Sequence, residues 1–127
     1  MDKKRILLVE DDPFISEMYT LKFEKAGFAS EVAMTGKEGV AKTREWRPDI
    51  VLLDVLIPEM DGFEVLSILK KDPGVKSIPV IMLTNLGQKE DIEKGAALGA
   101  AAYVVKAHFT PQEVVEKVRA ILASSDK

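Results

Sequence analysis

Four short apolar runs dominate the pattern of this chain, and each of them ends abruptly on a polar residue. They span residues 6–9, 50–53, 80–83 and 103–105, and segments with helical periodicity lie between them. Near-continuously apolar strands are typical of parallel sheets that helices cover on both faces. This alternation therefore predicts a doubly wound α/β fold, because parallel strands need right-handed crossover connections.

Residues typical of helix starts lie in the segments between these runs. Helices are predicted to begin at the Asp12-Pro13 cap, at the capping box of residues 35–38, at Asp61-Gly62, near Gln88 and at the Thr110-Pro111 cap. The first of these helices carries Ile15, Met18 and Leu21 at helical spacing. A weaker strand at residues 29–33 alternates apolar and polar residues, which favours a sheet edge. The expected fold is a five-stranded parallel sheet of order 2-1-3-4-5 with five helices.

The composition excludes several kinds of site. The chain has no cysteine and a single histidine, which excludes disulfides, thiolate nucleophiles, cysteine-bound zinc and multi-histidine metal sites. Any bound metal is therefore expected to have oxygen ligands, as Mg²⁺ prefers. The net charge of -3 argues against direct nucleic-acid binding, which draws on clustered lysine and arginine.

Length and hydropathy predict a simple organisation. The 127 residues are expected to form one domain, with a core at about residues 4–123 and no output domain. The first apolar run is too short for a secretion signal. With neither a membrane span nor a membrane partner expected, the predicted location is the cytoplasm.

The polar residues after the apolar runs are expected to lie together, because the carboxyl ends of parallel strands meet at one edge of a sheet. Glu10 and Asp11 follow the first strand, and Asp54 follows the third, which is its neighbour in the predicted order. Two carboxylates about 4.5 Å apart repel by roughly 3 to 4 kcal/mol at an effective dielectric of about 20, and a divalent cation removes this cost. Asp54 is then the expected nucleophile toward phosphorus, assisted by Mg²⁺. Thr84 and Lys106, which follow the other two runs, are expected to contact phosphoryl oxygens.

Motif residues stand at the ends of four predicted strands. They are Leu8-Val9-Glu10-Asp11, the block DIVLLDVLIPEMDG at residues 49–62, Leu83-Thr84, and Tyr103 three positions before Lys106. With these motifs the chain resembles the receiver domain of two-component response regulators. The resemblance covers residues 4–123, and the block at residues 49–62 is its most specific part.

The resemblance implies a phosphorylation-dependent switch, and no enzyme activity beyond phosphotransfer to itself and its own dephosphorylation. Asp54 would accept a phosphoryl group from a histidine kinase, a phosphotransfer protein or a small phosphodonor, with Lys106 and Thr84 as its partners in the reaction. Thr84 and Tyr103 would carry the switch to a downstream protein target, through the face of the fourth helix, fifth strand and fifth helix. The ligands implied for Mg²⁺, or for Mn²⁺ in its place, are Glu10 (largely through water), Asp11, Asp54 and the backbone carbonyl of Leu56.

Three features depart from the family pattern. Ala107 follows the lysine where a proline, often after a cis peptide bond, is usual. A cis bond before alanine costs about 2.5 to 4 kcal/mol, so a trans bond or a strained loop is expected. Asn85 replaces a small residue after the threonine and is expected to crowd or hydrogen-bond the phosphoryl entrance. Leu56 and Leu86, each two residues beyond a site residue, are hypothesised to shield the acyl phosphate from water.

Three other functions fit parts of the pattern. A phosphatase with an aspartyl nucleophile needs an acid two residues after Asp54, where this chain has Leu56. A nucleotide-binding module needs a glycine fingerprint after the first strand, where this chain is acidic. A pseudo-receiver, which docks partners without phosphorylation, stays an alternative because of Asn85 and Ala107.

Overall fold

One parallel sheet forms the middle layer of the protein. In the computed structural model, which describes residues 3–125, five strands run in the order β2-β1-β3-β4-β5, and each adjacent pair is parallel. The strands are β1 (Arg5–Val9), β2 (Ala29–Ala33), β3 (Ile50–Leu53), β4 (Val80–Thr84) and β5 (Ala102–Val105). The predicted fold class, the strand order and the edge position of β2 are confirmed.

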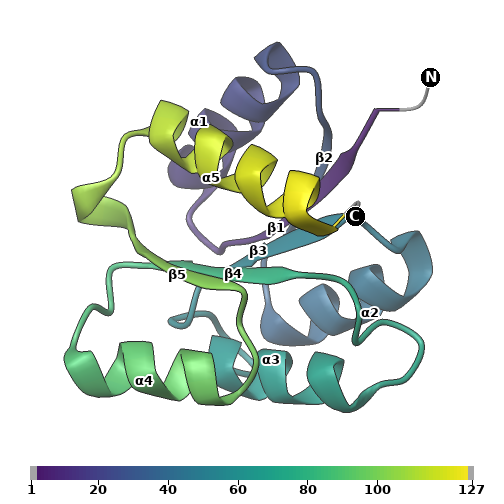
Figure 1. Cartoon of the computed structure of the whole chain (residues 1–127), viewed down its shortest axis with the longest axis vertical. Coiled ribbons are helices and arrows are strands. Elements are labelled where there is room, and N and C mark those ends of the chain that lie inside the picture. Colours follow the sequence, from purple (N-terminus) through teal and green to yellow (C-terminus); the bar gives the residue numbers. More distant parts are fainter. Residues whose placement is uncertain (1–2, 126–127) are drawn as a thin grey trace.

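Helices cover both faces of the sheet, with α1 and α5 on one side and α2, α3 and α4 on the other (Figure 1). The helices are α1 (Pro13–Lys25), α2 (Gly36–Trp46), α3 (Gly62–Lys71), α4 (Lys89–Ala97) and α5 (Pro111–Ser125), and a short 3-10 turn, η1 (Lys106–His108), follows β5. All five predicted helices are confirmed. None of the helices within residues 3–125 has the length and apolar character that a membrane crossing requires.

The central strands bury both of their faces. In β1, Ile6 and Leu8 belong to the core beneath α1 and α5, whereas Leu7 and Val9 belong to the core beneath α2 and α3. All four side chains are at most 1% exposed. Successive side chains of a strand point to opposite faces, so a strand between two helix layers needs apolar residues at every position.

Helix starts use the caps that the sequence indicates. Asp12 Oδ1 accepts hydrogen bonds from the backbone N of Phe14 at 2.9 Å and of Ile15 at 3.1 Å, so Asp12 is the N-cap of α1, as predicted. At the start of α5, Glu113 N donates to Thr110 Oγ1 at 3.1 Å and Thr110 N donates to Glu113 Oε1 at 2.9 Å. Each cap of this kind contributes about 1 kcal/mol and fixes where its helix leaves the preceding loop.

The buried face of α1 differs from the one that the spacing of its apolar residues indicates. Met18 is 44% exposed, Leu21 is 51% exposed and Phe14 is 83% exposed. The buried residues of α1 are Ser16, Tyr19 and Phe23. Of the three residues at helical spacing, only Ile15 packs against the core, and Met18 and Leu21 form an exposed apolar stripe with Phe14.

Candidate functional site

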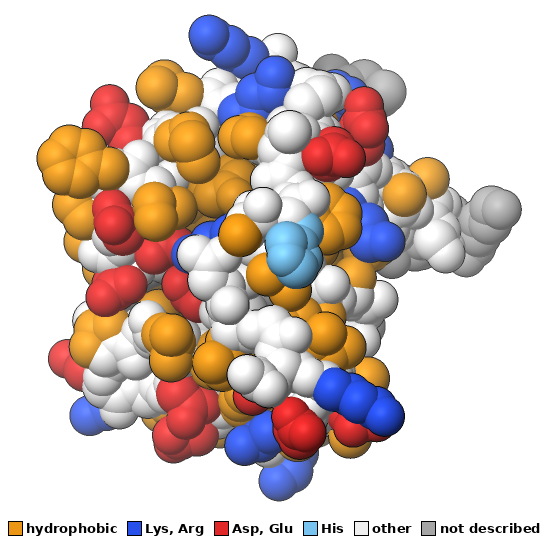
Figure 2. All heavy atoms as spheres, turned by 90° about the vertical axis from the view of Figure 1, so that its left-hand side faces the viewer, with side chains coloured by type: hydrophobic (Ala, Val, Ile, Leu, Met, Phe, Trp, Pro, Cys, Tyr) orange, Lys and Arg blue, Asp and Glu red, His pale blue; other side chains and the backbone are white. Residues whose placement is uncertain are grey.

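The register of the sheet brings the polar strand ends together. β1 and β3 end in register, so Glu10 and Asp54, which follow their last paired residues, leave the sheet side by side. β4 and β5 also end in register, which places Thr84 beside the residue that precedes Lys106. Figure 2 looks onto this edge, where acidic side chains gather to one side of the single histidine and hydrophobic side chains lie above them.

Three carboxylates form the centre of the site. Glu10, Asp11 and Asp54 each offer a carboxylate oxygen, and these oxygens lie within 4.8 Å of one another. Glu10 is 2% exposed and Asp54 is 6% exposed, whereas Asp11 is open to solvent. A hard cation such as Mg²⁺ prefers carboxylate oxygens and keeps several waters, so a half-open acidic cluster suits it. The three residues therefore fit a divalent metal ion.

The ammonium of Lys106 lies between two of these carboxylates. Its Nζ donates to Asp54 Oδ2 at 2.8 Å and also to Glu10 Oε1, and its side chain is only 10% exposed. Burial lowers the pKa of Lys106, but the hydrogen bonds and charges of the two carboxylates outweigh burial and raise the pKa above its ordinary value. Burial raises the pKa of the Glu10 carboxyl, and the hydrogen bond from Lys106 opposes this effect. The lysine is therefore charged at neutral pH.

The loop after β3 holds Asp54 through backbone contacts. Asp54 Oδ1 accepts a hydrogen bond from the backbone N of Leu56 at 3.2 Å. The loop closes with a bond from Gly62 N to Val55 O at 2.9 Å. A Cβ on Gly62 would lie 2.2 Å from the backbone carbonyl oxygen of Asp54, so the close approach of the two segments requires glycine. The sequence indicates Gly62 only at a helix start, because this second role depends on a contact with another segment.

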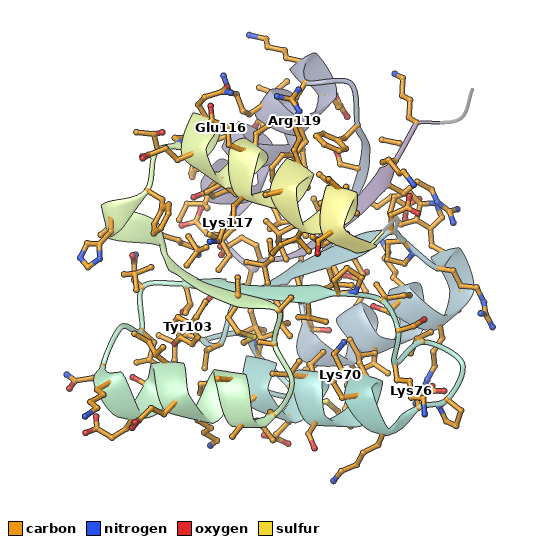
Figure 3. The ribbon with its side chains drawn as sticks, viewed as in Figure 1. Lys70, Lys76, Tyr103, Glu116, Lys117 and Arg119 are labelled. Carbon is orange, nitrogen blue, oxygen red and sulfur yellow. The ribbon has the colours of Figure 1, made fainter. Side chains whose placement is uncertain are left out.

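The loop after β4 connects Thr84 to Tyr103 through Leu86. Thr84 is fully buried, and its Oγ1 accepts a hydrogen bond from the backbone N of Leu86 at 3.3 Å. The Tyr103 hydroxyl donates to the carbonyl of Leu86, and Figure 3 shows Tyr103 between the sheet and α4. A Cβ on Gly95 would lie 2.9 Å from the Tyr103 ring, so the ring packs directly against this glycine of α4. Burial, together with nearby acidic charges, raises the pKa of Tyr103 to about 12.

Asn85 contacts the loop after β5, and its expected effect on the phosphoryl entrance stays a prediction. Its Oδ1 accepts a hydrogen bond from the backbone N of Ala107 at 2.9 Å. The described residues contain no cis peptide bond, so the Lys106–Ala107 bond is trans, which is one of the two outcomes expected.

Tyr19 lies beside the site although no motif indicated it. Tyr19 is 3% exposed, and burial raises the pKa of its hydroxyl. The charge of Lys106 lowers this pKa and the charge of Glu10 raises it, but burial has the largest effect. Tyr19 and Lys106 line the same hollow of about 220 Å³ between α1 and the turn after β5. The spacing of Ile15, Met18 and Leu21 does not include Tyr19, although Ile15 and Met18 line the same hollow.

Comparison with known proteins identifies the family. The family described as "Response regulator receiver domain" matches residues 6–119. The chain belongs to this family. The role of the receiver is therefore in two-component signalling, and receivers are generally signalling modules and not enzymes.

Relatives and solved structures agree with this assignment. The DNA-binding dual master transcriptional regulator RpaA of Synechocystis sp. is 39% identical over 123 residues, which cover 97% of this chain and 51% of the relative. The DNA-binding response regulator MtrA of Mycolicibacterium smegmatis is 40% identical over 124 residues, which cover 98% of this chain and 53% of the relative. A CheY-like receiver domain from Methanospirillum hungatei has a TM-score of 0.91 at 30% identity, covering 98% of each chain. CheY4 of Vibrio cholerae has a TM-score of 0.87 at 30% identity, covering 94% of this chain and 99% of its own.

One expectation about partners is contradicted by these relatives. The acidic balance of the chain predicted that nucleic acid is not a direct partner, yet RpaA and MtrA are both named as DNA-binding proteins. The receiver spans about half the length of these relatives. The charge argument was wrong because the net charge of a receiver reports only on its own surface.

Proposed function

We propose that the receiver accepts a phosphoryl group on Asp54 and changes its binding surface as a result. The observation that carries this proposal is the Lys106 ammonium, 2.8 Å from Asp54 Oδ2 beside a cluster of three carboxylates. A phosphoryl group that arrives at Asp54 meets a cation already in place. Charge-assisted hydrogen bonds of this kind are roughly twice as strong as neutral ones.

The reaction forms a bond between an Asp54 carboxylate oxygen and phosphorus, and it breaks the bond between phosphorus and the leaving group of the donor. Lys106 and Thr84 each contact one phosphoryl oxygen. The residues that would hold Mg²⁺ are Glu10, Asp11, Asp54 and the backbone carbonyl of Leu56. Mg²⁺ or Mn²⁺, when bound, supplies the positive charge that offsets the charge of the carboxylates and of the phosphoryl oxygens.

The phosphodonor is a histidine kinase, a phosphotransfer protein or a small phosphodonor. Support for a protein donor comes from the exposed apolar stripe of Phe14, Met18 and Leu21 on α1, because exposed apolar side chains that cluster together mark interaction sites. Met18 also lines the hollow beside Lys106, so a protein bound to the stripe reaches the site. The cytoplasmic location and the single-domain organisation stay predictions.

The output surface is the face of α4, β5 and α5. Leu86 is hydrogen-bonded to both Thr84 and Tyr103, through its backbone N to the Thr84 hydroxyl and through its carbonyl to the Tyr103 hydroxyl. A movement of Thr84 toward the phosphoryl group is therefore transmitted to the Tyr103 ring. Tyr103 and Ile92 line an apolar hollow of about 240 Å³ between α4 and β5, which a downstream protein can fill. The position of the Tyr103 ring then decides the shape of this hollow.

The test is incubation with acetyl phosphate and Mg²⁺, followed by intact mass measurement. The proposal predicts a gain of one phosphoryl group in the wild type and no gain in Asp54→Ala. No gain in the wild type would instead favour a docking module that works without phosphorylation.

A further inference from the structure

Asn85 and Ala107 join two loops of the site. Ala107 N donates to Asn85 Oδ1 at 2.9 Å across 22 positions of sequence. The bond lies just beyond the last paired residues of β4 and β5, which are Thr84 and Val105. It therefore extends the contact between these strands by one side-chain hydrogen bond, at the point where the chain leaves the sheet toward the site.

The two residues are chemically complementary. Ala107 has a backbone N–H, which a proline at this position would lack. Asn85 has a side-chain carbonyl oxygen, which a small residue after the threonine would lack. Each residue alone is a departure from the family pattern, whereas together they are the donor and the acceptor of one hydrogen bond.

The loops that this bond joins hold both side chains that are expected to contact a phosphoryl group. Lys106 directly precedes Ala107, and its Nζ lies 2.8 Å from Asp54 Oδ2. Thr84 directly precedes Asn85, and its hydroxyl is fully buried. A shift of one loop relative to the other would therefore change the separation of the lysine ammonium and the threonine hydroxyl.

We propose that Asn85 is a positioning residue for phosphoryl transfer, which acts by holding the Ala107 N–H and so keeps Lys106 and Thr84 in register around Asp54. This inference rests on the proposed function. Both Asn85 and Ala107 are exposed, so water replaces the hydrogen bond when it is lost, and the stability of the fold decreases little. The rate of phosphoryl transfer decreases more, because the reaction needs the contacts of Lys106 and Thr84 in place at the same moment.

The bond itself is tested without metal or phosphodonor. Amide hydrogen exchange of Ala107, followed by NMR, is expected to accelerate about fivefold in Asn85→Ala. Asn85→Asp is the matched control, because its carboxylate oxygen still accepts the bond and keeps the amide protected. Unchanged exchange in Asn85→Ala would overturn the proposal.

The positioning role is tested by the rate of phosphorylation with acetyl phosphate. Asn85→Ala is expected to lower the maximal rate about three- to tenfold. The half-saturating concentrations of acetyl phosphate and of Mg²⁺ are expected to stay within about twofold of the wild type, because the carboxylates are not moved. A maximal rate equal to that of the wild type would overturn the positioning role.

A double-mutant cycle adds a second criterion. Ala107→Pro removes the donor, so Asn85→Ala in that background is expected to change the rate less than about twofold. Equal losses in the two backgrounds would contradict the coupling, and the Asn85→Ala results stand even if Ala107→Pro does not fold. A wild type that takes up no phosphoryl group defeats the proposed function and the positioning role together, whereas the exchange of Ala107 still decides whether the bond exists.

Discussion

The ammonium of Lys106 lies 2.8 Å from Asp54 Oδ2, and it also donates to Glu10. One lysine therefore pairs with two buried carboxylates and offsets one of their two negative charges. Because these partners raise the pKa of Lys106, the stabilisation is fully present below the ordinary value of 10.5 and is lost only as the pH rises through the folded-state value. At neutral pH the metal-free protein thus has its own cation where we propose that Mg²⁺ binds.

Lys106→Met is expected to weaken the metal-free fold and to strengthen Mg²⁺ binding. Removing one partner of a buried ion pair costs about 3 to 5 kcal/mol, because the remaining charges stay buried. Mg²⁺ then has no internal competitor, and we expect its affinity to rise about tenfold, which is about 1.4 kcal/mol. Urea unfolding with and without Mg²⁺ measures both effects, since a ligand stabilises the state that binds it. Lys117→Met, at an exposed lysine of α5, is the control, and unchanged or weaker Mg²⁺ binding in Lys106→Met would contradict this account.

Gly62→Ala is expected to destabilise the protein by about 2 to 3 kcal/mol. The new Cβ would lie 2.2 Å from the Asp54 backbone carbonyl, and backbone on both sides of the contact has little freedom to move. Gly74→Ala is the matched control, because its Cβ would lie 3.2 Å from a side-chain oxygen of Asp72, a tight contact that a shift of a few tenths of an ångström relieves. Urea unfolding of the two variants gives the difference. Equal stability losses would show that the loop does not hold Asp54 as described.

The Tyr103 hydroxyl is expected to titrate near pH 12. A tyrosine with a raised pKa contributes stability that is fully present below its ordinary value of 10 and is lost as the pH rises toward about 12, when ionisation removes the bond to Leu86. Absorbance titration of the phenolate checks this, with Tyr103→Phe to identify the group. Tyr103→Phe is expected to cost about 0.5 to 1.5 kcal/mol in urea unfolding, because the ring stays and only the hydrogen bond is lost. A Tyr103 that titrates near its ordinary value would place the hydroxyl in solvent.

Leu56→Asn and Leu86→Glu are expected to speed loss of the phosphoryl group. The structure distinguishes the two positions, because Leu56 is 63% exposed whereas Leu86 is half-buried against the core. A polar side chain at either position brings water to the acyl phosphate, and we expect about tenfold faster dephosphorylation, or about 1.4 kcal/mol off the barrier. Decay of the phosphorylated mass after removal of the donor measures the rate. Unchanged decay in both variants would refute the shielding hypothesis.

The sequence predicted the sheet well because burial on both faces leaves a simple mark. The central strands β1, β3 and β4 bury apolar side chains on both faces and show as continuous runs, and the half-buried edge strand β5 also shows as one. The polar residues that follow these four runs were expected at one edge. The buried face of α1 could not be predicted from spacing alone, because Met18 and Tyr19 are neighbours, both are hydrophobic, and periodicity cannot tell which one is buried.

Contacts between distant loops could not be predicted from the sequence. The bond between Ala107 N and Asn85 Oδ1 depends on where two turns end in space, and no spacing along the chain records it. The same holds for Gly62, whose need for glycine comes from the backbone of Asp54 in a neighbouring segment. Helix caps were easier, because their donors and acceptors lie within one turn of each other.

The central claim is that Asp54 is the phosphoacceptor, and the most direct measurement locates the phosphoryl group. After incubation with acetyl phosphate and Mg²⁺, borohydride reduces an aspartyl phosphate to homoserine, and fragment mass spectrometry identifies its position. The account predicts homoserine at position 54, dependent on Mg²⁺ and absent from Asp54→Asn. A reduction product at Glu10 or Asp11 instead, or none at position 54, would contradict it.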